Sequence, residues 1–235
     1  MTSELQTPLT SVNGREVRPM LVLAVVLTAA FVQLVDVSIT NVAVPSIRTD
    51  LDASFSAVQL VQSGYQLAFA CTLITAARLG DLHGRRCLFL IGMVGFTLAS
   101  ILCGFATGPT MLVLSCVLQG RMSGLMYPQV LSVIQMVFPP RERPRAFAVL
   151  GATIGLATIL GPLLGGALIQ WDVAGSQWRS IFLVNVPIGV VAVIAAIRLL
   201  PESRARLAVV AHRDARRERA HRGDVRARRA PQDAR

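Results

Sequence analysis

Residues 146–170 read AFAVLGATIGLATILGPLLGGALIQ and contain no charged side chain. A helix that crosses the ~30 Å hydrocarbon core of a bilayer needs about 20 mostly apolar residues. A β-strand is excluded, because the run is far too long for a strand and its apolar residues do not alternate with polar ones. This stretch therefore predicts a membrane-spanning helix.

Five similar stretches occur elsewhere in the chain. The six predicted spans cover residues 20–45, 56–77, 87–107, 110–138, 146–170 and 180–200. The whole chain of 235 residues is 53% hydrophobic and only 15% charged, whereas a soluble domain carries about 25% charged residues. The first span is not a cleaved signal peptide, because it is too long and five more follow it. We therefore expect an all-α membrane protein with six transmembrane helices.

The arginines orient these helices. Every basic residue of the chain is an arginine. With the N-terminus inside, the cytoplasmic ends carry Arg15, Arg18, Arg78, Arg85, Arg86, Arg141, Arg143, Arg145 and Arg198, and the outer ends carry Arg48 and Arg179. An excess of Arg in short cytoplasmic loops is typical of membrane proteins. We predict a multi-pass protein of the cell (plasma) membrane with both termini in the cytoplasm.

The two ends of the chain differ from the spans. We divide the sequence into a cytoplasmic segment (1–19), a six-helix bundle (20–203) and an Arg/Ala-rich tail (204–235). The basic tail is expected to be disordered or to lie on anionic lipid headgroups. No nucleic-acid recognition fold accompanies it. Since the chain lacks Lys, we interpret the tail as the product of a frameshift or truncation near residues 203–208.

Ionisable residues inside spans are functional hypotheses, because they are costly to place in lipid. Asp36 in the first span either binds a proton or a cationic substrate, or is a structural carboxyl capped by hydroxyls and amides. Arg121 in the fourth span needs a carboxylate or water. A pair between Asp36 and Arg121 stays open, since hydropathy does not fix which way a helix faces.

Other polar and small residues of the spans form patterns. Four side chains of the second span follow helical spacing, and they either line a cavity or join helices by hydrogen bonds: Gln59, Gln62, Ser63 and Gln66. In the fifth span the glycine pairs 151/155 and 161/165 allow close helix contact, and Pro162 can bend the helix.

Four motifs, in order along residues 20–203, carry a resemblance to a known family. They are LVDVSITNVAVP (34–45), RLGDLHGRR (78–86), LQG with YP (118–120, 127–128), and GPLLGG with WRSIFLVNVP (161–166, 178–187). With these motifs the chain resembles the N-terminal half of a major facilitator superfamily drug:proton antiporter of the fourteen-helix EmrB/QacA type.

The resemblance implies proton-coupled efflux of small amphipathic or cationic compounds, as in multidrug resistance, with no enzymatic activity, cofactor or metal. Candidate proton- and substrate-binding residues are Asp36, Asn41, Gln62, Gln66 and Arg121. A gating loop that latches the two halves of such carriers corresponds to Gly80, Asp81, Gly84, Arg85 and Arg86. Here the Asp is expected near a helix N-terminus. The antiporter motif corresponds to Gly161, Pro162, Gly165 and Gly166.

Two departures from the family pattern matter. The arginine usual on the fourth helix of the family falls at Cys116, and the predicted helices stop after six. The expected partners are membrane lipids, a small-molecule substrate and protons, together with a second copy or the missing C-terminal half. The alternative is a transport-inactive membrane fragment that at most associates with a full-length carrier.

Overall fold

The computed structural model describes residues 10–12, 15–171 and 176–200. All of these belong to one compact unit. The Arg/Ala-rich tail and the predicted frameshift near residues 203–208 lie outside the described residues.

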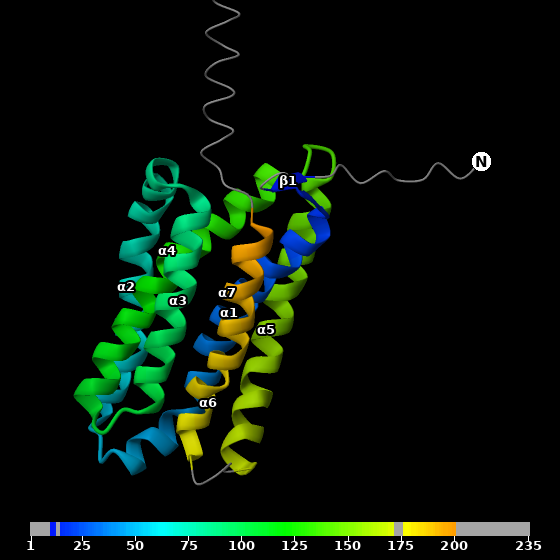
Figure 1. Cartoon of the computed structure of the whole chain (residues 1–235). Helices are drawn as coiled ribbons and strands as arrows, with labels where there is room; N and C mark the ends of the chain where they lie inside the picture. The colour runs from blue at the N-terminus through cyan, green and yellow to red at the C-terminus, as the bar shows by residue number, and fades with distance from the viewer. Residues whose placement is uncertain (1–9, 13–14, 172–175, 201–235) are drawn as a thin grey trace, which may run out of the picture. The chain divides into compact units, whose positions relative to one another are not determined.

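Helices form almost all of this unit (Figure 1). The elements are β1 (Thr10–Val12), β2 (Arg15–Val17), α1 (Pro19–Asp50), α2 (Phe55–His83), α3 (Arg85–Gly104), α4 (Pro109–Val137), α5 (Arg143–Trp171), η2 (Gln177–Arg179), α6 (Ser180–Leu183) and α7 (Asn185–Leu199). The long helices run up and down the bundle, and α1 begins at the same end at which α7 finishes. This arrangement confirms the predicted all-α architecture of six helices, with η2, α6 and α7 making up the sixth.

A small hairpin precedes α1 and was not predicted. Its strands are antiparallel, with Thr10 opposite Val17. Three-residue strands are too short to show an alternating pattern. The sequence nevertheless holds a signal, because Asn13-Gly14 between them is a dipeptide typical of two-residue hairpin turns.

Five helical stretches of the described chain are long and apolar enough to cross a membrane: α1, α2, α3, α5 and the stretch from Gln177 to Leu199. The fourth predicted span, α4, is also 29 residues long but less apolar. Its polar residues include Gln119 and Gln129, which are buried inside the bundle. Because these side chains meet other helices rather than lipid, the span forms without a uniformly apolar sequence.

The helices extend beyond the predicted apolar runs. Helix α1 continues to Asp50 and α2 to His83, so most of the residues between the predicted spans, 46–55 and 78–86, are helical. Hydropathy marks the part of a helix that lies in lipid, whereas the helix ends where its hydrogen-bonded ladder ends. Asp81 consequently lies in the last turn of α2. The expectation that it lies near a helix N-terminus is wrong.

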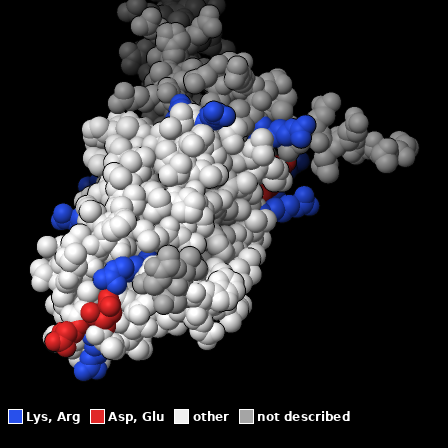
Figure 2. Space-filling view, turned by 60° about the horizontal axis from the view of Figure 1, so that its bottom comes forward, with Lys and Arg blue, Asp and Glu red and all other residues white. Residues whose placement is uncertain are grey.

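Two apolar clusters fill the bundle and a polar layer lies between them. One cluster includes Val26, Phe89 and Met126, and the other includes Ile39 and Trp178. Along α1, α3, α4 and α7, the buried polar residues between the members of the two clusters are Gln33, Thr97, Ser100, Gln119, Ser123 and Asn185, and Asp36 lies directly after Val35 at the edge of the second cluster. Most of the face seen in Figure 2 carries no charged residue, as expected for helices that contact lipid.

The connection between α2 and α3 is the single residue Gly84, whose φ of 96° lies in the left-handed region. A Cβ atom is disfavoured there. Gly108, before α4, has an extended backbone with φ −164°, and an added Cβ would meet nothing within 4 Å.

We predict that Gly84→Ala destabilises the bundle by about 1–2 kcal/mol, because it forces a side chain into a left-handed conformation. Gly108→Ala is the matched control and should be close to neutral. Thermal unfolding in detergent micelles, followed by circular dichroism, measures both. Equal transition temperatures for the two variants would contradict the assignment of strain to Gly84.

Candidate functional site

The polar layer is centred on Asp36, which is only 2% exposed on α1. One carboxylate oxygen, Oδ1, accepts hydrogen bonds from Gln119 Nε2 at 3.0 Å and from Asn185 Nδ2 at 2.6 Å. These amides come from α4 and α7, so three helices meet at one oxygen atom. A buried carboxylate needs such donors, because water does not solvate it.

The same amides connect Asp36 to α3. Gln119 Nε2 also lies 2.8 Å from Ser100 Oγ, and Asn185 Nδ2 lies 3.5 Å from it. Cys103 Sγ donates to Gln119 Oε1 at 3.4 Å, and its sulfur lies 3.6 Å from that of Cys116. The Gln119 side chain is therefore held at both its nitrogen and its oxygen, which fixes the direction in which it donates.

A pocket opens beside Asp36 between α1, α2 and α4. Its lining consists of Asp36, Val37, Thr40, Asn41, Val61, Gln62, Tyr65, Gln66, Cys116, Gln119 and Phe182. The enclosed space measures about 20 Å³, which holds about one water molecule. Oδ2 of Asp36 has no hydrogen-bond partner among the described residues, whereas Oδ1 has two. The lining contains one carboxyl group and no basic residue.

Four of the five predicted binding residues meet at this pocket: Asp36, Asn41, Gln62 and Gln66. Gln62 Nε2 donates to Asn41 Oδ1 at 2.6 Å and joins α2 to α1. The polar stripe of α2 thus has both predicted roles, because Gln62 and Gln66 line the pocket and Gln62 also bonds to another helix. Gln59 and Ser63 are exposed and do not line it.

Arg121 does not join the other four. It is exposed, and it makes no hydrogen bond or ion pair that involves Asp36 within the described chain. Arg121 lies two residues after Gln119, which turns it about 200° around the helix axis. Since Gln119 faces Asp36, Arg121 must face the other way, so the open question of a pair between Asp36 and Arg121 is answered against it.

The predicted gating residues lie together at the α2–α3 connection. Arg85 Nη2 forms an ion pair with Asp81 Oδ1 at 2.9 Å, and Arg85 Nη1 approaches Ser132 O of α4 at 3.4 Å. Arg86 Nη2 donates to Ile197 O of α7 at 2.5 Å. The backbone of Gly80 is packed so closely on α4 that an added Cβ would meet the amide of Gln129. These contacts join the connection to α4 and α7.

The residues of the predicted antiporter motif divide into two groups. Gly161 and Gly165 are buried against α1, where added Cβ atoms would meet Ser38 and Ile39. Pro162 is exposed, and a Cβ on Gly166 would meet nothing within 4 Å. The buried glycines therefore bring α5 onto the part of α1 that follows Asp36.

The other glycine pair of α5 does not make the expected close contact. Added Cβ atoms on Gly151 and Gly155 would meet nothing within 4 Å in the described chain. Both positions are exposed.

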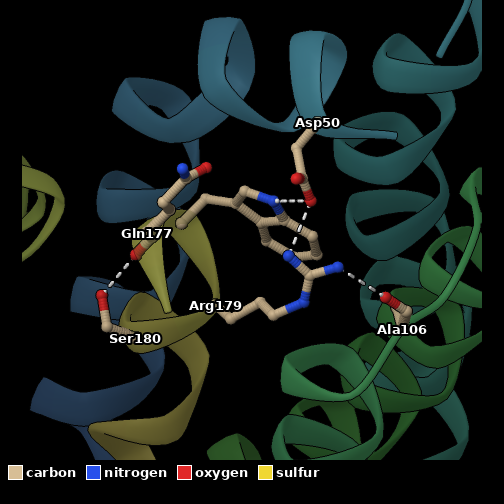
Figure 3. A network of polar contacts seen from close by, with 6 residues as sticks. Asp50, Ala106, Gln177, Arg179 and Ser180 are labelled. Carbon is tan, nitrogen blue, oxygen red and sulfur yellow. Dashed lines mark hydrogen bonds and ion pairs between the residues drawn. The ribbon is translucent and has the colours of Figure 1, made fainter. Parts of the chain in front are cut away.

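A second polar cluster lies at the end of the bundle opposite Gly84 (Figures 1 and 3). We call Asp50, Trp178 and Arg179 the clasp. Asp50 Oδ2 accepts from Trp178 Nε1 at 2.9 Å and from Arg179 Nη1 at 2.6 Å. Arg179 Nη2 also donates to Ala106 O at 3.3 Å, and its guanidinium lies 4.5 Å from the centre of the Trp178 ring.

Sequence reasoning missed the partners of Asp36 and the clasp. It assigned no role to Ser100, it quoted Gln119 and Asn185 only as parts of motifs, and it did not pair Asp50 with Arg179. Asn185 gave a weak signal, as a lone amide among apolar residues of the last span. Ser100 gave none, because a single Ser in an apolar helix is common.

Comparison with known proteins agrees with this geometry. The bundle of membrane-crossing helices around a buried carboxyl defines a multi-pass membrane protein, and the chain matches the family model of the Major Facilitator Superfamily over residues 26–231. The chain belongs to the major facilitator superfamily, which is a family of transporters and not of enzymes.

Several relatives are named for export or resistance. The chain is 47% identical over 183 residues to the probable actinorhodin transporter of Streptomyces coelicolor, covering 78% of this chain and 32% of that protein. It is 36% identical over 196 residues to the tetracenomycin C resistance and export protein of Streptomyces glaucescens, covering 83% and 36%. It is 34% identical over 184 residues to the multidrug transporter protein MdtP of Bacillus subtilis, covering 78% and 33%.

Solved structures share the fold at low identity. A bacterial homolog of the human lysosomal transporter Spinster, in an inward-facing and occupied conformation, superposes with a TM-score of 0.70 at 18% identity, covering 77% of this chain and 44% of that one. A peptide transporter, POT, gives a TM-score of 0.66 at 16% identity, covering 82% and 39%. The chain thus spans about a third of the length of the named relatives.

We predict that Gly165→Ala destabilises the bundle, because its Cβ would lie 2.7 Å from Ile39 Cγ1 and would force α5 away from α1. Gly155→Ala is the matched control on the same helix. It should be neutral or stabilising by up to about 1 kcal/mol, since Ala favours a helix more than Gly does. Thermal unfolding in micelles reports both, and a destabilised Gly155→Ala would contradict the open surroundings of that position.

Proposed function

We propose that the chain takes part in proton-coupled efflux of small amphipathic or cationic compounds across the plasma membrane, with both termini in the cytoplasm. The observation that carries this proposal is Asp36, a buried carboxyl with one oxygen held by two amides and the other without a partner beside the pocket. A proton and a cationic group compete for that second oxygen, so that binding of one releases the other.

The chemistry of the pocket supports this choice of substrates. Its lining offers one carboxyl, several amides and hydroxyls, and the apolar side chains Val37, Val61 and Phe182. A cationic group is complementary to such a surface, whereas an anion would meet a carboxylate with no basic residue beside it. Relatives named for transport, resistance and export of small molecules support efflux as the activity.

Transport by alternating access needs two helix bundles that move around a central site. The chain spans about a third of the named relatives, and we propose that a second copy or a C-terminal half supplies the other bundle. In that assembly Gly80, Asp81, Gly84, Arg85 and Arg86 gate the conformational change, and the antiporter motif on α5 packs near the interface. Membrane lipids, the substrate and protons complete the partners.

The alternative proposal is a transport-inactive fragment that associates with a full-length carrier. Co-expression with a full-length carrier separates the two functions, because a fragment that pairs with the carrier lowers its flux while giving none alone.

The experiment is dye efflux from liposomes that contain the purified chain, with an imposed proton gradient. We predict that Asp36→Asn reduces proton-dependent efflux of a fluorescent cationic dye at least about 10-fold, the effect of removing ~1.4 kcal/mol of coupling. Asp52→Asn is the matched control, since Asp52 is an exposed acid in the connection after α1. Proton-dependent flux that is equal in the intact chain and in Asp36→Asn, or absence of flux both in the chain alone and in the chain reconstituted with a C-terminal half, would refute the exporter proposal.

A further inference from the structure

The segment from Gln177 to Asn185 forms the first part of the sixth span. It begins with the three-residue turn η2 and the four-residue helix α6, and Val184, which has a right-handed helical conformation, joins them to α7. Gln177 at its start has φ 42°, in the left-handed region. Because the segment continues into α7, its first turn and Asn185 lie on the same helix. The contacts that hold the first turn therefore bear on where Asn185 lies.

The clasp holds the first part of this segment (Figure 3). Trp178 is fully buried, and both its indole N–H and the Arg179 guanidinium donate to one oxygen of Asp50. The second guanidinium nitrogen of Arg179 donates to the carbonyl of Ala106, between α3 and α4. The segment is thus fastened to the end of α1 and to the α3–α4 connection at once.

The last part of the segment leads directly to the polar layer. Ile181 and Phe182 are buried behind the clasp, and Asn185 then donates to Asp36 at 2.6 Å. Helix α1 is consequently bonded twice to the same short stretch, at Asp50 and at Asp36. A displacement of the stretch along α1 therefore changes the distance between Asn185 and Asp36. This weakens their hydrogen bond, because hydrogen bonds weaken steeply away from their ideal geometry.

We infer that Arg179 is a positioning residue for the proton site, because the clasp determines where the Asn185 amide meets Asp36. The inference rests on the proposed role of Asp36. Arg179 touches neither the pocket nor Asp36 and acts only through the stretch 180–185.

The partial exposure of the ion pair supports a role in positioning rather than in stability. The side chains of Arg179 and Asp50 are 30% and 32% exposed. Ion pairs with this access to solvent add little to the stability of a fold. Removing the guanidinium therefore leaves the buried anchors Trp178, Ile181 and Phe182 in place, while the stretch loses two of its fixed points.

The test is infrared spectroscopy of the Asp36 carboxyl in the purified chain in liposomes. The band of Asp36 is isolated by subtracting the spectrum of Asp36→Asn, made in the background of each variant. We expect Arg179→Ala to shift this band in the same direction as Asn185→Ala. Trp178→Phe, which keeps a buried ring but removes the indole donor to Asp50, should give a smaller shift of the same sign. Arg48→Ala, an exposed arginine in the last turn of α1, is the control and should leave the band unchanged.

A double variant makes the test specific. If the clasp acts through Asn185, Arg179→Ala adds no further shift when Asn185 is already Ala. Helical content by circular dichroism should match that of the unmodified chain. An unchanged band in folded Arg179→Ala, an equal shift in Arg48→Ala, or a shift that adds to that of Asn185→Ala would overturn the inference. If Arg179→Ala does not fold, Arg179→Lys and Trp178→Phe decide by the same criteria.

This readout does not depend on transport. A band that shifts as expected in a chain without dye efflux refutes the proposed function and keeps the positioning role. Efflux that depends on Asp36, together with an Asp36 band that the clasp variants leave unchanged, supports the proposed function and refutes the positioning role.

Discussion

A carboxyl group in the interior of a membrane bundle must find hydrogen-bond donors within the protein, and that constraint at Asp36 organises the helices around it. The donors come from Gln119 and Asn185, and both amides also reach Ser100. Four helices, α1, α3, α4 and α7, therefore meet at one polar layer, with apolar clusters on either side. Since amides donate in fixed directions, the layer sets the rotation of each helix about its own axis, which apolar packing alone does not do.

The remaining features fasten the bundle around that layer. Gly161 and Gly165 bring α5 onto α1 just beyond Asp36. At one end, Arg85 and Arg86 join the α2–α3 connection to α4 and α7. At the other end, the clasp joins α1 to the segment before α7. Each end of the bundle thus carries arginines that donate to backbone carbonyls of other elements. These bonds join the elements at that end without adding buried unpaired charge.

The sequence predicted the class of fold and part of the site for simple physical reasons. Apolar length reveals spans, and an acid inside a span is conspicuous, so the six helices and Asp36 were found. Helix ends were placed too early, because residues such as Asp50 and Asp81 are polar yet still helical. The partners of Asp36 were beyond reach, since they lie at positions 119 and 185 and depend on facing angles. The same lack of angles left Arg121 as a candidate until α4 showed it on the face away from Asp36.

The helices that supply the donors to Asp36 are synthesised after α1, so the carboxyl gains its donors in a fixed order. A nascent chain that has inserted only α1 and α2 carries the acid in lipid without either amide. Gln119 arrives with α4, and the shorter bond, from Asn185, becomes available only when α7 begins to enter the membrane. Because both donors belong to the six-helix unit itself, the carboxyl acquires them as these helices come together, before any other bundle is needed.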